Sequence, residues 1–150
     1  MIPVQEAIAY DISNKVSGPS DRIKNLEAQK FLYKHLEEYG DSLKDIQKAV
    51  DYVFDRGGQI IIQLYNDQIS GVVLTNETGM SGYIPENILV YIAVNQKFRG
   101  RGLGKDLMKK AMDSCTGDIA LHVEKNNPAR FLYEKLGFTN PYLEMRLKRS

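Results

Sequence analysis

The feature that most constrains the fold is a glycine-rich stretch between an apolar run and an amphipathic pattern. Gly100, Gly102 and Gly104 alternate directly after the apolar run 88–94. Glycine is a poor helix starter by propensity, yet a helical pattern follows. The N–H groups at a helix start lack intrahelical partners and carry the positive end of the helix dipole, so they bind anions, and glycine allows close approach. The stretch therefore predicts a strand, a phosphate-binding turn and a helix, in that order.

The spacing of these glycines differs from two common nucleotide-binding patterns. Gly100-x-Gly102-x-Gly104 does not match the G-x-G-x-x-G of dinucleotide-binding folds. Lys105-Asp106 follows the last glycine, so the Ser or Thr that holds magnesium in a P-loop is missing. A flexible turn with solvated basic side chains remains the simpler alternative. The basic residues around the turn are Lys97, Arg99, Arg101 and Lys105.

Composition narrows the class of protein. The 150 residues suit one domain, and 20 basic against 19 acidic residues give a net charge of +1. Such a chain has no general attraction to nucleic acid or to an anionic membrane. The single cysteine, Cys115, excludes an internal disulfide, and no apolar run approaches the roughly 18 residues of a spanning helix. We therefore expect a soluble cytoplasmic domain over residues 1–150.

Helical spacing dominates the first 58 residues. Val4, Ala7, Ile8 and Ile12 predict a short first helix, and two more helices follow. Ser42, with an acid three positions later, resembles a capping box at the start of the third helix. The positions that define the second and third helices are Leu32, His35, Leu36 and Tyr39, then Leu43, Ile46, Val50, Val53 and Phe54.

Strand patterns dominate from residue 59 onwards. Residues 59–65 and 68–75 flank Asn66-Asp67 and predict a hairpin. The run 88–94 predicts a central strand covered on both faces, and 118–123 and 143–148 predict two further strands. Helices are predicted after the glycine turn and between Asn127 and Gly137. The pattern as a whole indicates an α+β fold in which helices flank a mixed sheet.

Two blocks of sequence resemble one family. LVYIAVNQKFRGRGLGKDLM, residues 89–108, resembles the acetyl-CoA-binding core of the GCN5-related N-acetyltransferases, whose signature is Gln/Arg-x-x-Gly-x-Gly/Ala. NNPARFLYEKLGF, residues 126–138, is similar to a second motif of that family, in the same order along the chain. The resemblance runs from about Gln59 to Phe138. It implies a three-layer fold with a mostly antiparallel central sheet, a cofactor-binding core at 59–148 and a divergent helical part at 1–58.

The resemblance also implies how acetyl-CoA binds. Main-chain amides of the glycine turn would hold the pyrophosphate, and the strand before the turn would offer free backbone groups to the pantetheine arm. An amide in that strand would also polarise the thioester carbonyl. Asn126 would contact the same arm. By position, the turn residues are Arg99, Gly100, Arg101, Gly102, Leu103 and Gly104, and the strand residues are Ile92, Ala93 and Val94.

Two residues are candidates for acid–base work. Tyr133 lies where the family often has the general acid, although its place on an apolar stripe also suits a core residue. In several members of the family, a glutamate early in the strand before the turn acts as the general base. Here Ile88 and Leu89 occupy that neighbourhood, and Glu86 is the nearest acid. His122 and Glu124 are weaker alternatives.

The implied function is transfer of an acetyl group from acetyl-CoA to a primary amine by direct attack in a ternary complex, without a metal. A non-catalytic acyl-CoA-binding or sensing module and a nucleotide-binding protein are the alternatives. The acceptor would be a small-molecule or peptide amine. The N-terminal part could in addition form a homodimer contact. The family usually opens with a strand, whereas this chain shows only helical spacing there.

Overall fold

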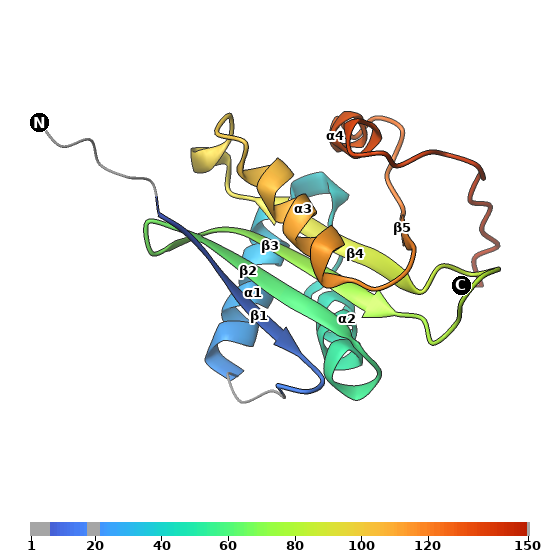
Figure 1. Cartoon of the computed structure of the whole chain (residues 1–150), viewed down its shortest axis with the longest axis horizontal. Helices are drawn as coiled ribbons and strands as arrows, with labels where there is room; N and C mark the ends of the chain where they lie inside the picture. The colour runs from blue at the N-terminus through green and yellow to red at the C-terminus, as the bar shows by residue number, and fades with distance from the viewer. Residues whose placement is uncertain (1–6, 18–21, 150) are drawn as a thin grey trace, which may run out of the picture.

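A five-stranded sheet forms the centre of the molecule. The computed structural model describes residues 7–17 and 22–149. The strands lie in the order of the chain, β1-β2-β3-β4-β5; the first four are antiparallel, and β5 is parallel to β4 (Figure 1). Their bounds are Ile8–Asn14 for β1, Gly58–Tyr65 for β2, Gln68–Glu77 for β3, Asn87–Val94 for β4 and Ile119–Leu121 for β5.

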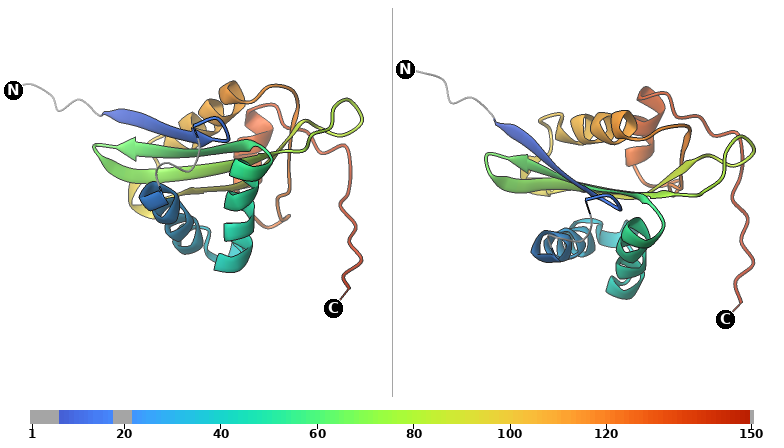
Figure 2. Two further views of the ribbon diagram at one scale, coloured as in Figure 1. Left: turned by 90° about the horizontal axis from the view of Figure 1, so that it is seen from below. Right: turned by 60° about the horizontal axis from the view of Figure 1, so that its bottom comes forward.

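Helices cover both faces of this sheet, which confirms the predicted α+β three-layer arrangement. α1 and α2 lie on one face, and α3 and α4 lie on the other (Figure 2). Each face has its own apolar core, one centred on Leu32, Ile46 and Leu74 and the other on Ile61, Leu107 and Met108. The helices are α1 Arg22–His35, α2 Leu43–Asp55, α3 Leu103–Ser114 and α4 Ala129–Lys135, with two short 3₁₀ helices, η1 Glu37–Tyr39 and η2 Gln96–Phe98.

The predicted first helix is wrong within the described residues, and Val4 lies outside them. Ile8–Asn14 forms β1, which pairs with β2 along its whole length, from Ile8 opposite Tyr65 to Asn14 opposite Gln59. Ile8 and Ile12 are four residues apart, a spacing that suits a strand as well as a helix. The edge of β2 offers main-chain groups that need partners, and this non-local pairing decides between the two. The opening strand typical of the family is therefore present.

The predicted last strand is also wrong. Residues 138–149 form no helix or strand, and the apolar side chains of the predicted strand lie in solvent: Leu143 is 78% exposed, Met145 91% and Leu147 75%. Alternating apolar residues form a strand only where a sheet edge accepts them. In the described part of the chain, β5 pairs only with β4, so its other edge has no neighbouring strand. The strand predicted at 118–123 is shorter, Ile119–Leu121, and leaves His122 beyond its end.

Several local signals are confirmed. The Ser42 side chain accepts a hydrogen bond of 3.2 Å from the Asp45 N–H and so caps α2. Asn66 and Asp67 have φ angles of 48° and 65°, as the tight turn of a two-residue hairpin requires. On β4, Val90 is an extra residue, because Thr75 lies opposite Leu89 whereas Leu74 lies opposite Tyr91. This β-bulge turns Leu89 towards α3 and Tyr91 towards α1 and α2.

A substitution at Gly58 tests the packing of β2 on β3. Gly58 has a φ of +130°, and an added Cβ would lie 2.0 Å from the Thr75 carbonyl oxygen. We expect Gly58→Ala to lower the free energy of unfolding by more than about 2 kcal/mol, because both strain and overlap oppose the methyl group. Gly79→Ala is the matched control, since Gly79 has a φ of +75° but no atom within 4 Å of the added Cβ. Urea unfolding that shows equal losses for both variants would contradict the packing described.

Candidate active site

A cleft opens where β4 and β5 part. These strands pair only at Asn87–Ile119, Ile88–Ala120 and Leu89–Leu121. Beyond Leu89 the main chain of β4 has no neighbouring strand on this side, and β5 runs on towards α4 (Figure 1). A cavity of about 470 Å³ follows this gap. It is lined by residues of α1, η1, β4, α3 and α4, among them Ile92, Ala93, Val94, Gly104 and Tyr133.

The opening also corrects the expectation that β4 is covered on both faces. Ile88 is 37% exposed, and Val90, Ile92 and Val94 are only half-buried. The apolar run predicts cover on both faces because it is continuous, but part of that apolar surface lines the cleft instead. Ile92, Ala93 and Val94, which the resemblance assigns to the pantetheine arm, line this cleft.

The glycine turn has the geometry that an anion needs. Gly100 and Gly102 have φ angles of 82° and 76°, and no atom lies within 4 Å of an added Cβ at either position. The Asp106 N–H donates to the Gly102 carbonyl at 3.1 Å, and this is the first helical bond of α3. The N–H groups of Leu103, Gly104 and Lys105 therefore precede the helical ladder and have no acceptor within it. The turn exposes bare backbone donors at a helix N-terminus.

The two arginines of the turn point to different partners. The Arg101 guanidinium donates to the Tyr65 hydroxyl at 3.0 Å and lies over its ring, with 5.5 Å between the guanidinium carbon and the ring centroid. Arg99 lines the cleft, and its Nη2 lies 3.7 Å from Glu37 Oε1. Of this pair, Arg99 is therefore the cation that faces the cleft.

Tyr133 is a core residue that also lines the cleft. The side chain is 7% exposed, and its ring packs 6.1 Å from the Phe138 ring, centroid to centroid. Among the described residues, its hydroxyl has no hydrogen-bond partner. Burial raises the pKa of Tyr133 to about 12, so the hydroxyl keeps its proton throughout the neutral range. The packed ring and the free hydroxyl show that the core and cleft placements are compatible.

The structure adds residues that sequence reasoning missed. His35 and the 3₁₀ helix η1 line the cleft on the side opposite α4, and burial lowers the pKa of His35 so that its neutral form is favoured. Asn127 also lines the cleft, whereas the predicted Asn126 is exposed and its carbonyl accepts a hydrogen bond of 3.3 Å from the Tyr39 hydroxyl. The apolar spacing of Leu32, His35 and Leu36 predicts one face of a helix. It does not predict that the C-terminal end of this helix lies beside the cleft.

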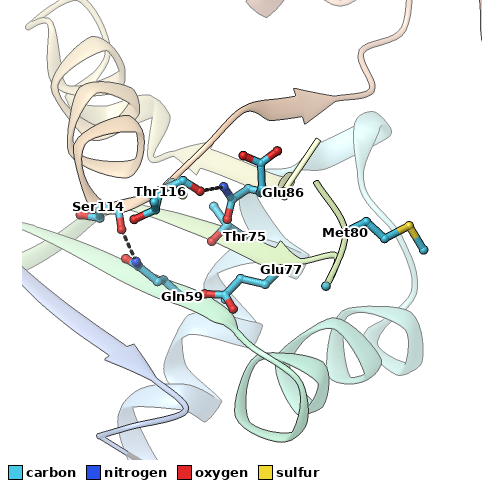
Figure 3. Close-up of a pocket in the computed structure, with 11 residues that line it drawn as sticks. Gln59, Thr75, Glu77, Met80, Glu86, Ser114 and Thr116 are labelled. Atoms are coloured by element: carbon cyan, nitrogen blue, oxygen red, sulfur yellow. Dashed lines mark hydrogen bonds between the residues drawn. The ribbon is translucent and has the colours of Figure 1, made fainter. Parts of the chain in front are cut away.

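Glu86 lies in a second cavity, of about 310 Å³, between the ends of β2, β3 and β4 and the C-terminus of α3 (Figure 3). Its Oε2 accepts a hydrogen bond of 3.3 Å from the Asp118 N–H. Gln59 Oε1 is buried there and has no hydrogen-bond partner among the described residues. Cys115 also lines this cavity, and burial raises the pKa of its thiol. Glu86 and Tyr133, the two predicted acid–base residues, therefore line different cavities.

Comparison with known proteins identifies the family. The model of the acetyltransferase (GNAT) family matches residues 21–138. A protein named 5-NmdU N-acetyltransferase, from Pseudomonas phage PaMx11, is 42% identical over 57 residues, which cover 37% of this chain and 41% of that protein. This match therefore spans less than half of either protein.

Solved structures share the fold at low sequence identity. Aminoglycoside N-acetyltransferase AAC(6′)-Iy in complex with CoA has a TM-score of 0.70 and 17% identity, with 99% of each chain covered. Ribosomal-protein-alanine N-acetyltransferase from Brucella melitensis biovar Abortus 2308 has a TM-score of 0.64 and 17% identity, with 95% of this chain and 99% of that chain covered.

The sheet and its cleft have the fold that these solved structures share. The chain belongs to the acetyltransferase (GNAT) family. In the part of the chain that the structure describes, no three His, Cys, Asp or Glu side chains gather as a metal site would require. Within the same residues, no helix is long and apolar enough to cross a bilayer.

Proposed function

We propose that this chain transfers an acetyl group from acetyl-CoA to a primary amine by direct attack in a ternary complex. The observation that carries the proposal is the continuity of two features: the glycine turn, with its free amides, adjoins a cleft along the part of β4 that β5 leaves open. The turn suits a pyrophosphate, because Gly100 and Gly102 leave its approach clear and Arg99 supplies positive charge. The cleft suits a long, thin arm with amide groups.

In this proposal the backbone of β4 binds and orients the acyl donor. The free N–H and C=O groups beyond Leu89 pair with the amides of the pantetheine arm, as a neighbouring strand would. One of these N–H groups also donates to the thioester carbonyl oxygen, which gains negative charge as the amine attacks. Both roles belong to main-chain atoms of Ile92, Ala93 and Val94 and of the residues just before them.

Tyr133 is proposed to assist the departure of the thiolate. The amine nitrogen forms its bond to the carbonyl carbon while the carbon–sulfur bond breaks and its electron pair goes to sulfur. A thiol has a pKa of about 8.5, so complete proton transfer from a phenol with a pKa of about 12 is uphill. A hydrogen bond from the Tyr133 hydroxyl to the developing thiolate stabilises the transition state without complete transfer.

A proton must also leave the incoming ammonium group, since an alkyl amine has a pKa of about 10.4. Glu86 remains a proposed acceptor through a chain of water molecules, but it lines the other cavity. His35 lines the same cleft as Tyr133 and is favoured in its neutral form, so we propose it as a second acceptor. The pH–rate profiles of His35→Gln and Glu86→Gln separate the two: the variant of the true acceptor loses the acid limb, and the other keeps it.

The proposed acceptor is a small-molecule or peptide amine. The named structural neighbours include an aminoglycoside enzyme and a ribosomal-protein enzyme, which supports either class.

A net charge of +1 supports neither nucleic acid nor membrane as a partner. The half-buried free thiol of Cys115 is consistent with a cytoplasmic location, and a homodimer is compatible with the proposal.

Ligand binding and turnover test the proposal against its alternatives. We expect CoA at micromolar concentration to raise the melting temperature, while ATP and NAD do not, because the cleft suits a pantetheine arm. We also expect acetyl-CoA with a panel of primary amines to release free CoA faster than hydrolysis, measured with a thiol reagent. Binding without amine-dependent release would favour a non-catalytic acyl-CoA-binding or sensing module. Equal stabilisation by ATP would favour a nucleotide-binding protein.

Tyr133→Phe tests the proposed general acid. We expect kcat to fall by about 10²- to 10⁴-fold with little change in the KM for acetyl-CoA, because only the hydroxyl is removed. Since Tyr133 stays protonated up to about pH 12, the ratio of wild-type to variant rates should be constant from about pH 6 to about pH 9. Tyr142→Phe is the matched control at a tyrosine that is 85% exposed. An unchanged kcat in folded Tyr133→Phe would remove the assignment.

A further inference from the structure

Glu37 lies where the cofactor's phosphates would compete with it. Its Oε1 lies 3.7 Å from Arg99 Nη2, and the same oxygen accepts a hydrogen bond from the Gln96 side chain. Glu37 and Arg99 line the same cleft, one from η1 and the other from the glycine turn. A carboxylate of this chain thus lies against the arginine that faces the cleft.

The backbone holds Glu37 in this position. Its φ is 56°, a left-handed conformation that costs a residue with a side chain about 1 kcal/mol or more. The surrounding turn is closed by the Tyr39 N–H, which donates to the Leu36 carbonyl at 3.1 Å. The Tyr39 hydroxyl also reaches across the cleft to the Asn126 carbonyl at 3.3 Å. These two bonds of Tyr39 hold the main chain of the turn that carries Glu37.

A guanidinium that already pairs with one anion binds a second anion more weakly. A phosphate that binds Arg99 gains two charge-assisted hydrogen bonds only if the guanidinium fork is free. With Glu37 in place, the phosphate must first displace this carboxylate from Arg99, which reduces the net gain in binding free energy. The carboxylate also repels the phosphate nearby. A part of the ligand without phosphate does not bind Arg99, so the Glu37 carboxylate does not affect its affinity.

We infer that Glu37 is a specificity-determining residue: it occupies Arg99 as an internal anion and thereby weakens binding of the phosphate-bearing part of acetyl-CoA. This inference rests on the proposed function. Arg99 and Glu37 are 54% and 42% exposed, so solvent screens their attraction. The expected effect on affinity is accordingly modest, about two- to five-fold.

Calorimetry with two ligands tests the inference. CoA carries the phosphates, and pantetheine lacks them. We expect Glu37→Gln to lower the Kd for CoA about two- to five-fold and to leave the Kd for pantetheine unchanged. Glutamine keeps the length and the hydrogen-bonding of the side chain but not its charge. Glu38→Gln is the matched control from the same 3₁₀ helix, because Glu38 also lines the cleft but forms no ion pair with Arg99; a smaller change is expected there.

A double-mutant cycle links the effect to the arginine. In an Arg99→Gln background, Glu37→Gln should no longer change the Kd for CoA. Weaker CoA binding by Glu37→Gln, equal tightening for pantetheine, or an effect that persists without Arg99 would each overturn the inference. If Glu37→Gln does not fold, Glu37→Asn replaces it, because asparagine tolerates the left-handed backbone. Failure of the wild-type protein to bind CoA at all would instead overturn the proposed function.

Discussion

The incomplete pairing of β4 with β5 is the constraint on which the site depends. Three residue pairs join the strands, from Asn87–Ile119 to Leu89–Leu121. Within the described residues, the remaining main chain of β4 pairs with β3 on one side and has no strand on the other. Main-chain groups of β4 on this side therefore remain available to pair with a ligand, and the proposed function uses them in this way. The sheet itself therefore forms one wall of the cleft.

The glycine turn and the cleft adjoin each other because the turn follows β4 in the chain, after the short helix η2. Helix α3 starts at the turn and packs Leu107, Met108 and Ala111 against the sheet, so the exposed amides at its N-terminus are held at a fixed place relative to β4. Tyr133 reaches the same cleft from α4, with its ring packed in the core. Packing in the core thus positions each group that the proposed reaction uses.

The sequence predicts the parts of the fold whose signals are local. The capping serine of α2, the hairpin at Asn66-Asp67 and the glycine turn all depend on neighbouring residues, and all are confirmed. β1 and the segment 143–148 depend on whether a distant strand edge accepts them, and both predictions were wrong. The sequence does not indicate Glu37 and His35 as site residues for the same reason, since only the fold brings them into one cleft with Arg99 and Tyr133.

The bulge at Val90 has a consequence for how such chains can change over time. Because one surplus residue inverts the facing of the residues after it, Tyr91 packs in the core under α1 and α2 and donates to Asp41, while Ile92 packs against the core under α3. Losing that residue would exchange the two sides in a single step. Insertions and deletions should therefore be excluded from this strand in descendants that keep the activity, even where substitutions are frequent.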